Sequence, residues 1–96
     1  MNSKERAKLR AIAVNVKPIF QVGKEGVTHD LAVGVLNALK KREIVKISVL
    51  ENCDFDIKTI ANDLAIKNDC EVVQVIGHKI VLYKVNPENP VISNEI

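Results

Sequence analysis

A short segment bounded by two glycines, Gly23-Lys24-Glu25-Gly26, constrains the fold of this chain more than any other feature. It separates an apolar run at residues 18–22, typical of a β-strand, from residues 28–42, which have the apolar spacing of a helix. The glycines allow a sharp turn because no Cβ restricts the backbone. A strand, a tight turn and a helix in this order predict an α/β arrangement.

The glycine segment has two interpretations. A glycine-bounded turn is commonly a turn and nothing more, and a GxxG pattern is weak by itself. A helix that begins at Thr28, however, would point free N–H groups and its positive dipole end at the turn, which suits a phosphate group. Lys24 adds a mobile positive charge. The strand before the turn and the helix after it favour the anion-binding interpretation.

The rest of the chain contains further short elements. We expect helices at about 3–15, 28–42 and 56–68, and strands at 18–22, 44–50, 72–76 and 79–85. Ser3 is the predicted N-cap of the first helix and Thr28 that of the second, while either Asp54 or Asp56 caps the third. Gly77-His78 is a two-residue hairpin signal between the last two strands.

This order of elements, helix-strand-helix-strand-helix-strand-strand, predicts an α/β fold. We expect a two-layer sandwich, with a mixed four-stranded sheet and three helices. The two strand–helix–strand units favour right-handed crossovers with some parallel pairing, and the final hairpin is antiparallel. The strand order stays open. We expect one domain at residues 1–85 and a loosely ordered tail at 86–96, which contains Pro87 and Pro90.

The amino-acid composition argues against a membrane protein and against an enzyme. The chain has 96 residues, of which 47% are hydrophobic, and no run approaches the ~18 apolar residues of a membrane span. Cys53 and Cys70 form no CxxC pair, so we expect reduced structural cysteines in a cytoplasmic protein that does not contact a membrane. The scattered histidines and acids match no nucleophile or metal motif. We therefore expect neither an enzyme nor a cofactor.

Positive charge is concentrated in the first half of the chain. Residues 1–48 have a net charge of +6 and residues 49–96 a net charge of −4. A basic half of this kind would attract a polyanion. Lys40-Lys41-Arg42 ends the second helix, where it complements the helix dipole, so whether this triplet also binds a ligand is left open.

Several ordered segments make the chain similar to a known family. They are Leu9, Ala13, Lys17-Pro18, Gln21–Gly26, Val49–Asn52, Val73–Gly77 and Val81–Lys84. On these residues the chain resembles the CRM domain family (chloroplast RNA splicing and ribosome maturation), in its bacterial single-domain YhbY form. The resemblance covers most of the chain and excludes about the last ten residues.

The resemblance implies the fold of the C-terminal domain of translation initiation factor 3, and it implies RNA binding. The bacterial form of the family is associated with precursors of the large ribosomal subunit. We therefore expect a monomer that binds ribosomal RNA and assists ribosome assembly, with ribosomal proteins as further partners. The alternative is a small regulatory or protein-interaction module that does not bind RNA directly.

The expected RNA-binding site combines the glycine loop with the basic first helix. We expect the loop to lie against the sugar–phosphate backbone, as the GxxG loop does in KH domains. The predicted site residues are Gly23, Lys24, Glu25, Gly26, Thr28, His29, Lys4, Arg6, Lys8, Arg10 and Lys17. Phe20, Phe55 and Tyr83 are expected to pack in the protein rather than stack on bases, which favours recognition of RNA shape and backbone.

Overall fold

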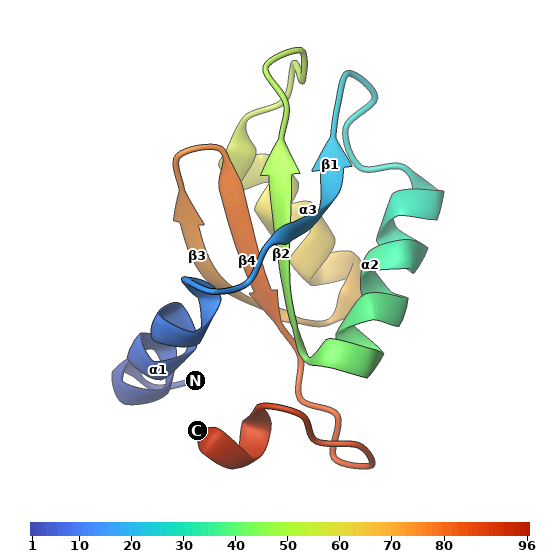
Figure 1. The fold of residues 1–96 in the computed structure, drawn as a ribbon. Helices are drawn as coiled ribbons and strands as arrows, with labels where there is room; N and C mark the ends of the chain where they lie inside the picture. Colours follow the sequence, from blue (N-terminus) through green and yellow to red (C-terminus); the bar gives the residue numbers. More distant parts are fainter.

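The computed structural model describes residues 1–96 and contains one four-stranded sheet with three α-helices (Figure 1). The elements are α1 Ser3–Ala13, β1 Pro18–Val22, α2 His29–Arg42, β2 Ile44–Val49, α3 Ile57–Asn68, β3 Glu71–Ile76, β4 Lys79–Tyr83 and the 3₁₀ helix η1 Ser93–Glu95. This order confirms the predicted α/β fold class. None of the helices is both long and apolar enough to cross a membrane.

The sheet has the strand order β1-β2-β4-β3, so β1 and β3 form its two edges. β1 runs parallel to β2, whereas β4 is antiparallel to both of its neighbours, and this confirms the predicted mixed sheet. Ile76 pairs with Lys79 across the hairpin, which leaves Gly77 and His78 as its turn. Gly77 has a φ of 56°, a backbone conformation that favours glycine.

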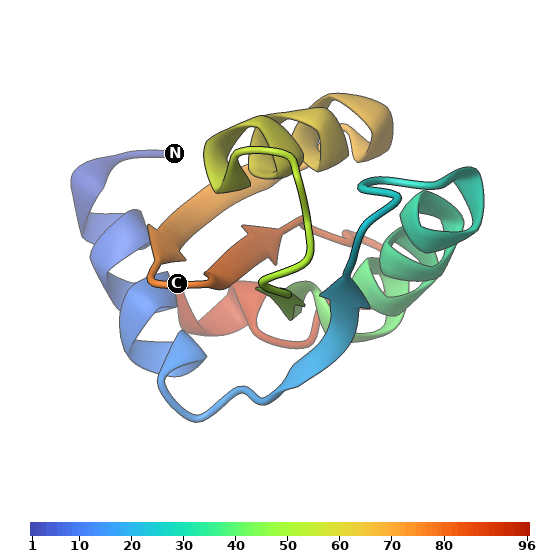
Figure 2. The same cartoon turned by 90° about the horizontal axis from the view of Figure 1, so that it is seen from above.

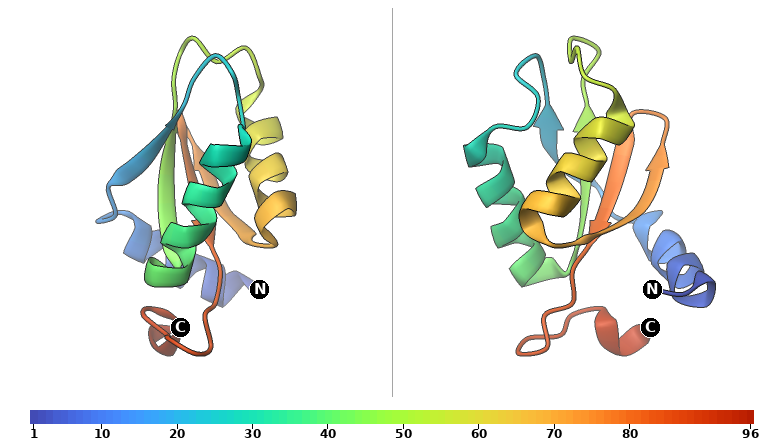
Figure 3. Two further views of the ribbon diagram at one scale, coloured as in Figure 1. Left: turned by 90° about the vertical axis from the view of Figure 1, so that its right-hand side faces the viewer. Right: turned by 180° about the vertical axis from the view of Figure 1, so that it is seen from behind.

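Helices α2 and α3 cover one face of the sheet (Figure 3). Side chains alternate between the two faces of a strand, so Val45, Ile47 and Val49 of β2 all point toward these helices. Together with Val35 of α2 and Leu64 of α3, they belong to a main core cluster of 11 buried residues. This sheet with its two helices is the predicted two-layer sandwich.

Helix α1 and the C-terminal tail cover part of the opposite face (Figure 2). Strand β4 is apolar on both faces, and its Val81 and Tyr83, together with Ile44 of β2, alternate with the residues of the main core. Leu9 and Ala13 of α1 pack on this second set in a smaller cluster of 6 buried residues. The two-layer sandwich therefore gains a partial third layer.

The helix ends agree with the sequence except in α1. Thr28 caps α2 as predicted, and Asp56, one of the two candidates that the sequence left open, caps α3. The N-cap of α1 is Asn2, so the prediction of Ser3 was wrong. Asn2 Oδ1 accepts from the backbone N–H of Glu5 at 2.8 Å, and the Glu5 carboxylate accepts from the backbone N–H of Asn2. This reciprocal capping box satisfies two N–H groups that Ser3 alone would leave free.

Helix α1 ends at Ala13, two residues before the predicted end at about Asn15. The ammonium group of Lys46 in β2 donates to the carbonyl of Ala13 at 2.7 Å. A cation at this position satisfies one of the free carbonyls of the helix and complements the negative end of its dipole.

The tail at residues 86–96 is held by one buried carboxylate. Glu43 is 0% exposed, and its two oxygens accept from the backbone N–H groups of Asn86, Val91, Ile92 and Ser93 at 2.6–2.9 Å. Burial raises the pKa of this carboxyl, but the four donors outweigh burial and bring the pKa down to about 2. The tail thus has more contacts than its proline content suggested.

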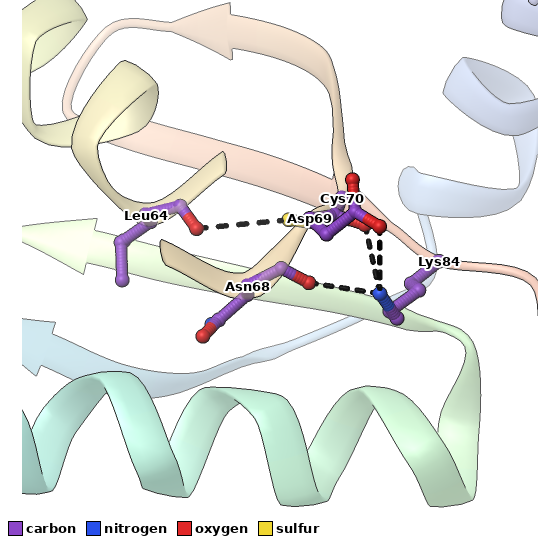
Figure 4. Close-up of polar contacts among 5 residues, drawn as sticks. All are labelled: Leu64, Asn68, Asp69, Cys70 and Lys84. Carbon is purple, nitrogen blue, oxygen red and sulfur yellow. Dashed lines mark hydrogen bonds and ion pairs between the residues drawn. The ribbon is translucent and has the colours of Figure 1, made fainter. Parts of the chain in front are cut away.

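Lys84 and Cys70 make local contacts at the C-terminal end of α3 (Figure 4). The Lys84 ammonium donates to the carbonyls of Asn68 and Asp69 at 2.9 and 2.8 Å, and so caps this helix end. Cys70 Sγ lies 4.0 Å from the carbonyl oxygen of Leu64. Burial raises the pKa of the Cys70 thiol to about 11, so this side chain stays neutral at physiological pH.

Candidate nucleic-acid interface

The glycine loop forms the tight turn between β1 and α2. The Gly26 N–H donates to the carbonyl of Gly23 at 3.0 Å, which closes the turn. Lys24 and Glu25 at its tip are exposed. Thr28 Oγ1 accepts from the backbone N–H of Leu31 at 3.1 Å. The turn therefore presents one lysine, and at the start of α2 the backbone N–H groups of His29 and Asp30 have no acceptor within the fold.

The loop is supported by the segment that joins β2 to α3, and the two lie side by side in Figure 1. Gly26 has a φ of +68°, and a Cβ at this position would lie 2.8 Å from the Phe55 ring. A Cβ on Gly23 would lie 3.6 Å from Asn52 Oδ1, an ordinary contact distance. The fold thus demands glycine at position 26 and tolerates other residues at position 23.

The aromatic residues follow the sequence expectation only in part. Tyr83 is buried in the smaller core cluster, and Phe20 packs against the main cluster. Phe55 contacts Gly26 but remains 51% exposed. The sequence placed Phe55 at the start of a helix and gave no signal that its ring would lie beside the glycine loop.

A shallow hollow adjoins the glycine loop, lined by Gln21, Gly23, Lys24, Glu25, Gly26, Thr28 and Leu31. Its two charged side chains, Lys24 and Glu25, have opposite signs. Glu51 and Asp54 of the neighbouring segment are exposed acids. The loop therefore offers a specific geometry for a phosphate, with no excess of positive charge around it.

His29 does not join this hollow. It lines a separate one between α2 and α3, together with Ala32, Val33, Leu36, Lys67 and Asn68. No group of three histidine, cysteine or acidic side chains lies close enough to hold a metal ion. The structure thus places His29 apart from the loop residues with which the sequence grouped it.

The basic residues of α1 also lie apart from the glycine loop. Helix α1 packs against β3, whereas the loop follows β1 at the opposite edge and the opposite end of the sheet (Figure 1). Lys4, Lys8 and Arg10 are exposed there. Arg6 is engaged within the fold, because its Nη1 donates to the carbonyls of Val72 at 2.7 Å and Val73 at 3.0 Å. The predicted site residues therefore do not form a single patch.

Lys17 stands at the start of β1, and Lys24 follows the end of the same strand. A strand of five residues is roughly 17 Å long, so these two lysines cannot contact the same phosphate. Lys17 instead shares a hollow with Arg42 and Lys46. Arg42 closes the basic triplet whose role the sequence left open, and Lys46 was not among the predicted site residues.

Known proteins share both the sequence and the fold of this chain. Residues 1–84 match the CRS1 / YhbY (CRM) domain family. The Bacillus subtilis protein YqeI, named as a probable RNA-binding protein, is 42% identical over 89 residues, which are 93% of this chain and 93% of that protein. A Haemophilus influenzae protein named as an RNA-binding protein is 29% identical over 89 residues, 92% of this chain and 89% of its own length.

The fold also matches a solved structure. The solution structure of the hypothetical protein SAV1595 from Staphylococcus aureus, a proposed RNA binding protein, has a TM-score of 0.79 to this chain. The two sequences are 38% identical, and the match covers 93% of each chain. The names of these relatives describe RNA-binding proteins and not enzymes. The segments of the chain that resemble the family thus lie in one matching domain, and the protein belongs to the CRS1 / YhbY (CRM) domain family.

Proposed function

We propose that this protein binds RNA and assists assembly of the large ribosomal subunit. It would contact precursor ribosomal RNA in the cytoplasm as a monomer, with ribosomal proteins as neighbours in the assembling particle. The observation that carries this proposal is the exposed glycine loop, with Lys24 at its tip, in a chain whose relatives are named as RNA-binding proteins.

The loop has the features that RNA backbone contact requires. The turn at Gly23–Gly26 has no bulky side chain except the exposed Lys24 and Glu25, so a sugar–phosphate chain can approach its backbone closely. The free N–H groups at the start of α2 can donate to a phosphate oxygen. Lys24 supplies a mobile counter-charge.

Recognition would rest on RNA shape rather than on base sequence. Tyr83 is buried and Phe20 packs on the main core, so only Phe55, 51% exposed beside the glycine loop, is available to stack on a base. Contacts to phosphates and 2′-hydroxyls do not depend on base identity, and they dominate the recognition of folded RNA. We therefore expect binding that depends on the folded shape of the RNA and little on the identity of its bases.

Binding of purified protein to transcripts of large-subunit ribosomal RNA tests the proposal. Filter binding at several salt concentrations should give a log–log slope of roughly −3.5 to −4.5 if about five phosphates are neutralised. Small-subunit transcripts of equal length serve as the control and should bind more weakly. Equal affinity for both would refute the large-subunit assignment, and no affinity for either at low salt would refute RNA binding itself.

A further inference from the structure

A second site lies at the far end of β1 from the glycine loop. A hollow of about 500 Å³ is lined by residues from α1, β1, β2, the end of α2 and the C-terminal tail. Its apolar lining includes Ile12, Val16, Ile19, Ile44 and Ile92, and its cations are Lys17, Arg42 and Lys46. Nothing in the family assignment or in the names of the relatives gives this hollow a role.

The fold brings these cations together from separate parts of the chain. Glu43 has a φ of 64°, and this left-handed residue turns the chain from the end of α2 into β2 directly after Arg42. Lys46 is held at the hollow by its hydrogen bond to the carbonyl of Ala13. Lys17 lies in the short link between α1 and β1. The positive charge is therefore positioned by the packing of several elements.

The tail completes the wall of the hollow. Val91 and Ile92 line it, and their N–H groups donate to Glu43 Oε1 at 2.6 and 2.7 Å. The carboxylate of Glu43 is buried by these contacts and points away from solvent. The Glu43 carboxylate is thus hydrogen-bonded to the tail, although Glu43 directly follows Arg42 in the sequence.

The charged side chains that line the hollow all have the same sign. Three cations line it and no carboxylate does, whereas Lys24 at the glycine loop has Glu25 beside it. The residues of the basic triplet Lys40-Lys41-Arg42 do not all face the same hollow. Lys40 lines a different hollow, together with Lys84, Asn86 and Glu88, so only Arg42 of the triplet faces the present one. An anion with an apolar part is the ligand that this combination fits.

We propose that this hollow is a second RNA contact, which takes one nucleotide of the RNA that the glycine loop binds. The phosphate would lie between Lys17 and Arg42, whose guanidinium can donate two parallel hydrogen bonds to it. The base would lie on the apolar surface near Ile19 and Ile92. This inference rests on the proposed RNA-binding function, and it places Lys17, a predicted site residue, in a contact separate from the glycine loop.

The position of the hollow fits an RNA that also reaches the glycine loop. Edge strand β1 joins the two sites and is roughly 17 Å long, a distance that a short stretch of RNA spans. Ile19 and Gln21 of this strand are exposed. The RNA would therefore follow an open sheet edge, with a phosphate contact at each end.

Two charge-matched double variants test the phosphate contact. Lys17→Ser/Arg42→Ser removes both proposed phosphate ligands. The control, Lys40→Ser/Lys41→Ser, also removes two positive charges, from residues in the last turn of α2 that do not line the hollow. All four side chains are exposed, so both variants should fold, as circular dichroism would verify. On a large-subunit transcript, we expect about tenfold weaker binding for the first variant and about twofold or less for the second.

The salt dependence gives a second readout of the same variants. Loss of this one phosphate contact should reduce the slope of log affinity against log salt by about 0.7–0.9 in Lys17→Ser/Arg42→Ser, and leave it unchanged in the control. Equal losses in the two variants would overturn the hollow as a contact while RNA binding stands. If the unaltered protein binds no RNA, the proposed function fails and this site fails with it.

Isoleucine methyl NMR tests the placement of the base. Octaadenylate RNA should shift the methyl signals of Ile19 and Ile92 upfield through the adenine ring current, and leave Ile66 unshifted because it lies on α3, which does not line this hollow. Polyphosphate, which has the charge but no base, should produce no such upfield shift. Equal shifts with both polyanions, or no shift of Ile19 with octaadenylate, would overturn the nucleotide assignment.

Discussion

The ring of Phe55 occupies the space that a side chain on Gly26 would need. A Cβ on Gly26 would lie 2.8 Å from Phe55 Cδ2 and 2.9 Å from Cε2. This contact joins the loop after β1 to the segment after β2, although the two residues are far apart in the sequence. The shape of the candidate RNA-binding loop therefore depends on a residue outside the GxxG pattern.

Replacement of Gly26 by alanine should destabilise the protein. The residue has a φ of +68°, which is costly for alanine, and the new methyl group would clash with Phe55. We expect the free energy of unfolding to fall by about 1–3 kcal/mol, as measured by urea denaturation. Gly23→Ala is the matched control and should change it by less than about 1 kcal/mol, because its nearest neighbour is at 3.6 Å and its φ is not positive.

A double variant separates the two causes. In Phe55→Ala/Gly26→Ala the clash is gone and only the backbone strain remains. Gly26→Ala should therefore lower the free energy of unfolding less in the Phe55→Ala protein than in the unaltered protein. Strict additivity of the two substitutions would show that the ring does not press on position 26.

Glu43 should make stability depend on pH in the acid range. Its pKa is about 2 in the folded protein against an ordinary value of 4.5, so the folded state favours the ionised carboxylate. The stabilisation is complete above pH 4.5 and is lost as the pH falls toward 2, in total about 3 kcal/mol. Urea denaturation at pH 2.5, 4 and 7 measures this loss.

The variant Glu43→Gln should already be less stable at pH 7, because a neutral amide is a weaker acceptor for the four tail N–H groups. Its stability should then change less between pH 4.5 and 2 than that of the unaltered protein. Glu25→Gln, which removes an exposed carboxylate, provides the control. Parallel pH profiles for the unaltered protein and Glu43→Gln would refute the role of this carboxylate.

Arg6 should matter more for stability than for RNA binding. Its guanidinium satisfies the carbonyls of Val72 and Val73, where the register of β3 is interrupted by a bulge. Arg6→Met should lower the free energy of unfolding by about 1–2 kcal/mol, whereas Arg10→Met, which removes an exposed side chain of the same helix, should change it by less than about 0.5 kcal/mol. Equal stability of the two variants would show that Arg6 contributes to the surface charge but not to the stability of the fold.

The two charged residues of the glycine loop should have opposite effects on RNA affinity. Lys24→Gln removes the proposed phosphate partner and should reduce the salt slope by about 0.7–0.9, whereas Glu25→Gln removes a repulsive charge and should strengthen binding. Lys67→Gln on α3, which removes a lysine that lines neither proposed contact, should leave the slope unchanged. Unchanged RNA affinity in both loop variants would show that the RNA-binding site lies elsewhere.

Much of the fold could be predicted because local patterns decide it. The apolar spacing of α2, its cap at Thr28 and the Gly77-His78 hairpin depend on neighbouring residues, and the structure contains all three. The sheet order and the position of α1 depend on tertiary packing. One sequence signal for a covered second face is the apolar character of Val81 and Tyr83, which alternate with Ile80 and Leu82.

The candidate site could be predicted from the sequence only in part. The loop itself follows from Gly23 and Gly26, but the direction of each charged side chain does not. Arg6 turns to strand carbonyls 66 and 67 residues away, and His29 lines a hollow formed with α3. The donors to Glu43 are backbone groups 43–50 residues further on, which no local pattern could indicate.

The docking of α1 has a consequence for synthesis of the protein. Leu9 and Ala13 of α1 pack with Val73, Val81 and Tyr83, which are translated 60 or more residues later. The apolar side of α1 therefore stays uncovered in the nascent chain until β3 and β4 have emerged from the ribosome. Formation of this cluster is coupled to synthesis of the final hairpin, and a product terminated before β3 would expose the apolar side of α1 to chaperones and proteases.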